Sequence, residues 1–189
     1  MASWALTGLP ICLTCVTMLL RQLHATDAAD YFRLRVLSDR EFPEYVGMSA
    51  ERELIAGEAR IAELLAGYDK EGIVVFGAFA DTTLVGVACI SRKLSPKYHH
   101  KVFVWGMYVA HEFRRQNVGK RLVTHIIEWA RNTGGVTAVQ LQVTTTNARA
   151  RTLYEQFGFV VYGTESASLF AAGKYHDVYL MELAIKANA

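Results

Sequence analysis

Apolar and polar residues follow strand-like and helix-like patterns in turn along most of this chain. Apolar runs at 18–23, 72–80 and 83–92 predict strands, and the last two form a hairpin across a two-residue turn. Residues 101–110 are nearly all apolar, which predicts a central strand buried on both faces. Gly106 interrupts that run, and an isolated Gly within a strand indicates a β-bulge or a close backbone approach.

Helix-like spacing separates these strands. Val118, Leu122 and Ile126 recur at the interval that puts them on one helical face, and Asn147 is suited to cap a following helix. The predicted helices cover 26–37, 50–67, the stretch from Val118 to before Gly134, and the stretch from Asn147 to Gly158. Further strands are predicted at 136–146 and at about 159–165 and 175–183. The order β-α-α-β-β-β-α-β-α-β-β indicates a mixed α/β sheet.

Length and composition narrow the class of protein. The 189 residues are expected to form one domain, and about half of them are apolar. A net charge of +2 is too small to indicate a nucleic-acid partner by itself. The three cysteines do not read as a disulfide framework and suit a reducing compartment, so we expect a cytoplasmic location. Cys12 and Cys15 lack a second ligand pair, so no metal site is predicted.

The uncharged first twenty residues leave two interpretations open. One is a membrane segment, although Gly8, Pro10 and several hydroxyl side chains interrupt the apolar run and its start lacks basic residues. The other is an N-terminal extension at 1–17 followed by a single domain at 18–189. We favour the extension and predict no membrane partner.

A basic turn stands between the predicted central strand and the helix after it. The stretch FRRQNVGKRL at 113–122 holds four of the chain's twenty Lys and Arg residues. The N–H groups at the start of a helix attract anions, and these cations raise the local potential, which predicts a site for a phosphate-bearing cofactor. The alternative is a basic surface turn that only aids solubility. The spacing matches neither a Walker loop nor a dinucleotide fingerprint.

Two motifs resemble those of the GNAT N-acetyltransferase superfamily. The stretch MYVAHEFRRQNVGKRLV resembles the family's acetyl-CoA motif, in which a central strand leads into Arg/Gln-x-x-Gly-x-Gly/Ala and a helix. The stretch NARARTLYEQFGF fills every fixed position of the second motif, Asn-x-x-Ala-x-x-Leu-Tyr-x-x-x-Gly-Phe. The resemblance covers roughly 18–183. It implies an acetyl-CoA-dependent N-acetyltransferase whose mixed, mostly antiparallel, splayed sheet is flanked by about four helices.

The resemblance also implies which residues hold the cofactor. The strands at 101–110 and 136–146 are expected to diverge, with the pantetheine arm between them and Tyr154 pointing at the thioester sulfur. Backbone groups of Tyr108 and Val109 are expected to hold the arm. The remaining residues implied at the cofactor are Asn147 beside the arm and, on the turn that binds the pyrophosphate, Arg114, Arg115, Gln116, Asn117, Val118, Gly119 and Lys120.

The chain departs from the family motif at Asn117, where the family usually has Gly, and at Lys120 directly after Gly119. A Gly at the first of these positions serves a positive φ angle or a close approach to phosphate. Asn is the non-Gly residue best suited to positive φ. We therefore predict that Asn117 substitutes for Gly in that conformation.

Acetyl transfer needs a neutral amine, a polarised carbonyl and a departing thiolate. We expect a backbone N–H near Val109, released by the bulge at Gly106, to polarise the carbonyl. Tyr154 is the expected general acid for the sulfur, the alternative being a core aromatic. No Glu or Asp on the central strand offers a general base. A water relay is one option, and the candidate side chains are Glu165, His111, Glu112, His99 and His100.

The acceptor is predicted to be a primary amine, either of a small molecule or of a protein or peptide, that attacks the thioester directly. Acidic residues of the predicted helix-loop-helix at 26–67 hint at a cationic amine but more commonly face water. A rival hypothesis is a non-catalytic acyl-CoA-binding module, motivated by the missing base and by Asn117. We expect no nucleic-acid partner for this protein, and we allow for a homodimer.

Overall fold

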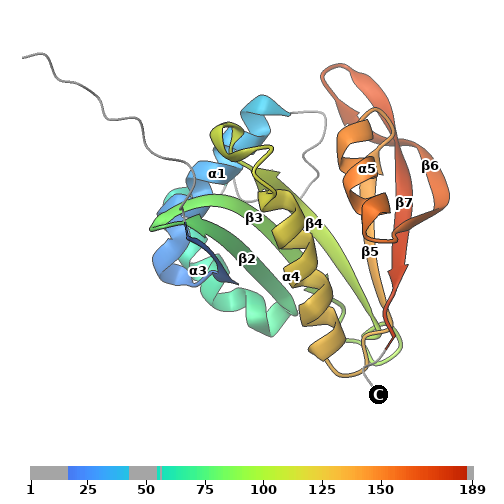
Figure 1. Ribbon diagram of the computed structural model, residues 1–189, viewed down its shortest axis with the longest axis horizontal. Coiled ribbons are helices and arrows are strands. Elements are labelled where there is room, and N and C mark those ends of the chain that lie inside the picture. Colours follow the sequence, from blue (N-terminus) through green and yellow to red (C-terminus); the bar gives the residue numbers. More distant parts are fainter. Residues whose placement is uncertain (1–16, 43–54, 56, 187–189) are drawn as a thin grey trace, which may run out of the picture.

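The computed structural model describes residues 17–42, 55 and 57–186, which form an open sheet with helices on both faces (Figure 1). The strands are β1 (Met18–Gln22), β2 (Ile73–Ala80), β3 (Thr83–Arg92), β4 (Lys101–Val109), β5 (Ala138–Thr144), β6 (Val160–Ala171) and β7 (Lys174–Ala184). The α-helices of these residues are α1 (Ala28–Glu41), α3 (Glu58–Tyr68), α4 (Val118–Asn132) and α5 (Ala148–Gln156). Short 3-10 helices occur at Ala25–Asp27, Asp69–Glu71 and His111–Phe113.

The sheet has seven strands in the order β1-β2-β3-β4-β5-β7-β6, and every neighbouring pair is antiparallel except β4 and β5. This confirms the predicted mixed, mostly antiparallel sheet. The predicted extension at 1–17 lies almost wholly outside the described residues, as does the first part of the helix predicted at 50–67. Within the described part of the chain, no helix combines the length and the apolar character needed to cross a membrane.

Separate clusters of buried side chains cover the two faces of the sheet. α1 and α3 contribute Tyr31, Leu34 and Ile61 to one cluster, and each of these side chains is completely buried. α4 and α5 cover the other face, where Leu122 and Ile126 are buried as their spacing predicted.

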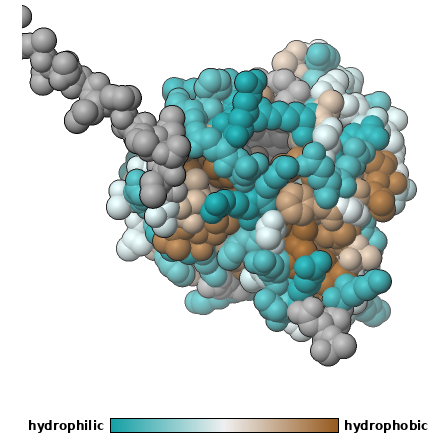
Figure 2. Space-filling model, viewed as in Figure 1, coloured by the Kyte–Doolittle hydropathy of each residue, from teal (hydrophilic) through white to brown (hydrophobic). Residues whose placement is uncertain are grey.

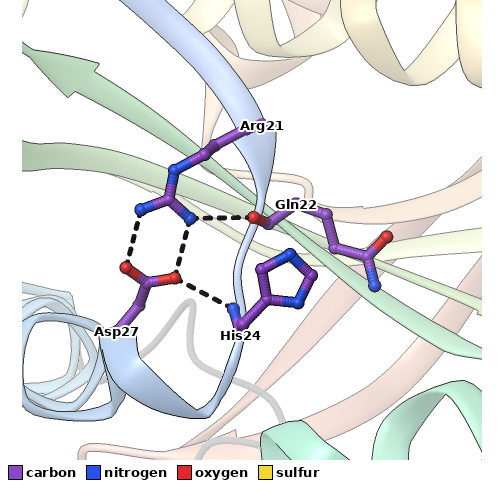
Figure 3. A network of polar contacts seen from close by, with 4 residues as sticks. All are labelled: Arg21, Gln22, His24 and Asp27. Carbon is purple, nitrogen blue, oxygen red and sulfur yellow. Dashed lines mark hydrogen bonds and ion pairs between the residues drawn. The ribbon is translucent and has the colours of Figure 1, made fainter.

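A polar network joins β1 to the start of α1 (Figure 3). The guanidinium of Arg21 donates two hydrogen bonds of 2.7 Å to the carboxylate of Asp27 and lies over the ring of Phe79. The same carboxylate accepts a hydrogen bond from the backbone N–H of His24 at 2.9 Å. The bond from Arg21 is the largest cause of the lowered pKa of Asp27. This network fixes the direction in which the chain leaves the sheet for α1.

The bulge predicted at Gly106 is confirmed. Gly106 has a φ of 61°, in the left-handed region. Pairing with β3 shifts there, because Cys89 lies opposite Trp105 whereas Val87 lies opposite Tyr108. Two residues of β4 therefore face one residue of β3, which bends the strand and turns its backbone groups.

The prediction that the central strand is buried on both faces is wrong. Val102 and Val104 of β4 are buried, but Phe103 and Trp105 between and after them are only half-buried. β5 pairs with β4 from Lys101 to Val104 and no further. Beyond Val104, the second half of β4 therefore lacks β5 as a neighbouring strand that would cover it.

The C-terminal hairpin is longer than predicted, since β6 and β7 run on to a two-residue turn at Ala172 and Gly173. Both turn residues have positive φ, 49° and 75°, as a type I′ hairpin turn requires. Ala is an unusual residue for that position, so the turn gave little signal in the sequence. β6 forms the edge of the sheet, and hydrophobic residues such as Val160 and Phe170 are exposed there.

Candidate functional site

A cavity of about 740 Å³ lies where β4 and β5 separate. Residues from both faces of the sheet line it: Arg35 and Ser38 come from α1, whereas Ala150 and Tyr154 come from α5. The strands contribute Ile73, Ser91, Phe103, Val104, Trp105, Gly106, Met107, Gln142, Val143, Thr144, Glu165, Ser168, Leu169 and Val178. The predicted divergence of the two strands is therefore confirmed, and the cavity lies between them with lining residues from both faces of the sheet.

The basic turn before α4 contains two residues in the left-handed conformation. Asn117, the N-cap of α4, has φ 62° and ψ 11°, which confirms the conformation predicted for it. Arg115 also has a φ of 62°, which the sequence did not indicate. A hollow ringed by hydrophilic residues lies between the N-terminal end of α4 and α5 (Figure 2). The side chains of Arg115, Asn117 and Lys120 are exposed, so this turn presents positive charge and a helix start to solvent.

Arg114 differs from the other basic residues of the turn, because its side chain points back to α1. Its guanidinium forms a bidentate ion pair with Glu41, and its Nε donates to the carbonyl oxygen of Val109 at 2.9 Å. The hydroxyl of Tyr108 donates to the same carboxylate at 2.8 Å. The end of α1, the end of β4 and the start of the turn are thereby joined. Arg114 adds little to the positive potential of the turn, because Glu41 compensates its charge.

The contacts among Glu41, Arg114 and Tyr108 shift the pKa values of Glu41 and Tyr108. The hydrogen bond from Arg114 is the main cause of the lowered pKa of Glu41. Burial, followed by the bond to Glu41, raises the pKa of Tyr108 to about 12. Glu41 is thus ionised and Tyr108 neutral at physiological pH. The phenol therefore keeps the proton that it donates to the carboxylate.

Tyr154 reaches the cavity from α5. The side chain of Asn147 caps this helix by accepting a hydrogen bond from the N–H of Ala150 at 3.1 Å. The hydroxyl of Tyr154 donates to the Sδ atom of Met107, on the bulged part of β4, at 3.2 Å. Burial raises the pKa of Tyr154 to about 12. A neutral phenol that can donate to a sulfur atom therefore lies beside the split in the sheet.

Of the side chains considered as general bases, Glu165 alone belongs to the described lining of the cavity. It lies on β6 next to a shift in the pairing of β6 with β7. Arg35 is a lining residue that the sequence analysis missed. Its guanidinium is buried, and Nη1 donates to the carbonyl oxygen of Gly106 at 3.3 Å. Its position on the predicted helix gave no sign of this, because helix-face residues are mostly structural.

The described residues contain no group of three His, Cys, Asp or Glu side chains placed to hold a metal ion. The described residues that line the split include hydrogen-bond donors, one carboxylate and one guanidinium. These groups can polarise a carbonyl, assist a leaving group and move a proton.

Comparison with known proteins identifies the family. The sequence profile of the acetyltransferase (GNAT) family matches residues 32–159. L-amino acid N-acetyltransferase AaaT of Escherichia coli strain K12 is 30% identical to this chain over 113 residues, which are 60% of this chain and 69% of that protein. An acetyltransferase of the GNAT family from Streptococcus pneumoniae has a similar structure, with a TM-score of 0.77, 22% identity, and coverage of 90% of this chain and 100% of the other.

A second similar structure carries the acyl donor. It is yncA, a putative acetyltransferase from Salmonella typhimurium solved with acetyl-CoA, with a TM-score of 0.71, 18% identity, and coverage of 92% of this chain and 96% of the other. The matched span of the family profile takes in most of α1, the bulged strand, the basic turn and Tyr154. The chain belongs to the acetyltransferase (GNAT) family of acetyl-CoA-dependent acyltransferases.

Proposed function

We propose that this protein transfers the acetyl group of acetyl-CoA to a primary amine by direct attack of the amine on the thioester. The observation that carries the proposal is the cavity at the split in the sheet, which the bulge at Gly106 and the phenol of Tyr154 both line. A donor entering from the face of α4 and α5 can meet an acceptor entering from the face of α1 there. The relative AaaT acts on L-amino acids according to its name, which is consistent with an amine acceptor.

The pantetheine arm would lie along the edge of β4 that β5 leaves. Beyond Val104 no described strand pairs with that edge, so its N–H and C=O groups are suited to pair with the amides of the arm as a strand would. Tyr108 and Val109 form the far end of that edge and would hold the arm. Asn147, at the start of α5, would lie beside it.

The phosphates of the donor would bind the turn before α4. Because helix geometry leaves its first N–H groups without partners, those of Val118, Gly119 and Lys120 can donate to phosphate oxygens. The left-handed conformations of Arg115 and Asn117 turn the backbone toward the helix start. The same turn includes Arg114, whose side chain holds the turn through Glu41, and Gln116, whose side chain donates to the carbonyl of Glu112 at 2.9 Å.

Glu165, a backbone N–H and Tyr154 would assist successive steps of the reaction. Glu165 would accept a proton from the ammonium form of the acceptor and release it to solvent. The neutral nitrogen then bonds to the carbonyl carbon, while a backbone N–H near Val109 stabilises the charge that develops on the oxygen. The carbon–sulfur bond breaks, and Tyr154 donates a hydrogen bond to the departing sulfur. The nitrogen loses its second proton, and the sulfur gains one, so the products are an amide and free CoA thiol.

The raised pKa of Tyr154 limits how far this residue can protonate the departing sulfur. A phenol with a pKa of about 12 keeps its proton at physiological pH and is available as a donor. A thiol has a pKa of about 8.5, so complete transfer from this phenol to a thiolate is unfavourable. Tyr154 would therefore act chiefly by hydrogen bonding, with the proton from nitrogen completing the thiol.

The rival function is an acyl-CoA-binding module without catalysis, and one experiment separates the two. Calorimetry with CoA measures binding, and release of free thiol from acetyl-CoA measures turnover over a panel of primary amines. The proposal predicts CoA binding together with thiol release that depends on the amine. Binding without amine-dependent release for any member of the panel would leave the binding module as the function.

A further inference from the structure

The pairing of β6 with β7 is irregular at the point where β6 reaches the cavity. Pairing stops after Glu165 and resumes at Leu169. Between these points, residues 166–168 of β6 face Asp177 of β7 alone. A regular antiparallel pair would place one residue of β6 opposite Asp177, so β6 contains a β-bulge here. Of the described lining residues, Glu165 is the only acidic one, and it stands directly before this bulge.

The side chain of Asp177 closes the bulge from the opposite strand. Its Oδ1 atom accepts a hydrogen bond of 2.8 Å from the backbone N–H of Ala167, the central residue of the bulge. Ala167 has a φ of 52°, in the left-handed region, which a residue with a Cβ atom adopts only at a cost in free energy. Hydrogen bonds to carboxylates are stronger than those to neutral acceptors. The bond from Ala167 to Asp177 therefore offsets part of the cost of this conformation.

The backbone of Asp177 is held at the end of β5. Its carbonyl oxygen accepts a hydrogen bond of 2.9 Å from the N–H of Thr145, the residue after that strand. Thr144, the last residue of β5, is buried and lines the cavity. Asp177 thus connects the cavity wall that β5 supplies with the one that β6 supplies. It is not itself among the described lining residues.

The bulge accounts for the contribution of β6 to the cavity. β6 is the outermost strand, and β7 separates it from β5 (Figure 1). Lining residues nevertheless come from both sides of the bulge, with Glu165 before it and Ser168 and Leu169 at its end. A bulge bends its strand and redirects side chains, so it allows an edge strand to supply groups to a cavity that lies beyond its neighbour.

We propose that Asp177 is a positioning residue for acetyl transfer, which through its bond to Ala167 holds the bulge that places the carboxylate of Glu165 at the cavity. This deepens the function proposed above and rests on it, because it takes Glu165 as the group that accepts a proton from the acceptor amine. Asp177 acts on the reaction through Glu165 and not by contact with the reacting atoms.

The test removes the acceptor of this hydrogen bond in the full chain and measures amine-dependent thiol release. Asp177→Ala loses the acceptor, whereas Asp177→Asn keeps an oxygen atom in its place. We expect kcat/KM for the amine to fall about 10-fold or more in Asp177→Ala, as for loss of a hydrogen bond to a charged group, and Asp177→Asn to recover most of that loss. The KM for acetyl-CoA should stay the same, because the phosphate turn is untouched.

Glu128→Ala is the matched control, since it removes an exposed carboxylate from α4 that is not among the described lining residues. If Asp177→Ala does not fold, Asp177→Glu takes its place in every comparison. Glutamate keeps the carboxylate but displaces it by one methylene group, so its bond to Ala167 should be lost or weakened.

A double-mutant cycle assigns the effect to Glu165. In the background of Glu165→Gln the positioned base is already absent, so Asp177→Ala should lower kcat/KM by less than about twofold. A purely structural role of Asp177 would lower it by the same factor in both backgrounds, and that result would overturn the proposal.

The remaining outcomes separate this inference from the proposed function. Turnover by Asp177→Ala at the parent rate, or equal losses in Asp177→Ala and Asp177→Asn, would overturn the role of the hydrogen bond and leave the acetyltransferase function standing. CoA binding by the parent protein without turnover of any amine would refute the function itself.

Discussion

Removing the hydroxyl of Tyr154 tests the proposed leaving-group assistance. Tyr154→Phe keeps the ring, which packs edge-on against Phe159 at a centroid distance of 5.6 Å. Within the described part of the chain the hydroxyl donates one hydrogen bond, to the Sδ atom of Met107, and a thioether is a weak acceptor. The free energy of unfolding should therefore fall by no more than about 1 kcal/mol. Affinity for CoA should persist, because the phosphate turn is untouched.

Turnover should fall by about 10–100-fold, toward the lower end of what a positioned acid contributes. The reason is the mismatch between a phenol pKa of about 12 and a thiol pKa of about 8.5, which limits Tyr154 to partial proton donation. The loss should be smaller with acyl donors whose thiols are more acidic. Because the phenol stays neutral below about pH 10, the substitution should leave the pH profile below that value unchanged in shape.

The assay is thiol release under single-turnover conditions, in which the chemical step is observed directly. Tyr162→Phe is the matched control, since Tyr162 is 56% exposed on β6. If Tyr154→Phe reacts at the rate of the parent protein in this assay, Tyr154 is only a core aromatic. Water or another group would then protonate the sulfur.

Substitutions at three further positions test other parts of the structure. Asn117→Gly should bind CoA at least as well as the parent, whereas Asn117→Val should bind more weakly because a β-branched residue is strained at positive φ; equal affinities by calorimetry would contradict this. Gly106→Ala should lower the unfolding free energy by about 1–2 kcal/mol, since φ is 61° and the new Cβ would lie 3.1 Å from Arg35 Nη1; unchanged thermal melting would refute it. Asp27→Asn should cost about 1 kcal/mol at most at pH 7, because its partner Arg21 is partly exposed. The folded pKa of Asp27 is lowered, so its contribution is present above the unfolded pKa of about 3.9 and is lost as pH falls further, and melts of the parent and variant should converge in acid.

Local features of the sequence determined the elements and much of the cofactor turn. The spacing of Val118, Leu122 and Ile126 is a property of neighbouring residues, and it identified the buried face of α4 correctly. The left-handed conformation of Asn117 was predictable because φ preferences belong to the residue itself. The same holds for the cap at Asn147 and for the bulge at Gly106.

Tertiary structure alone decided how those elements meet. The burial of β4 could not be read from its apolar run, because it depends on where β5 stops pairing, and β5 is distant in the sequence. Arg114 looked like one of four equivalent cations, yet its charge is compensated by Glu41 at the end of a helix far earlier in the chain. Arg35 and Glu165 line one cavity only because the sheet splits between them. Periodicity and motifs report on nearest neighbours along the chain, whereas burial and charge pairing depend on contacts that form only when the whole sheet assembles.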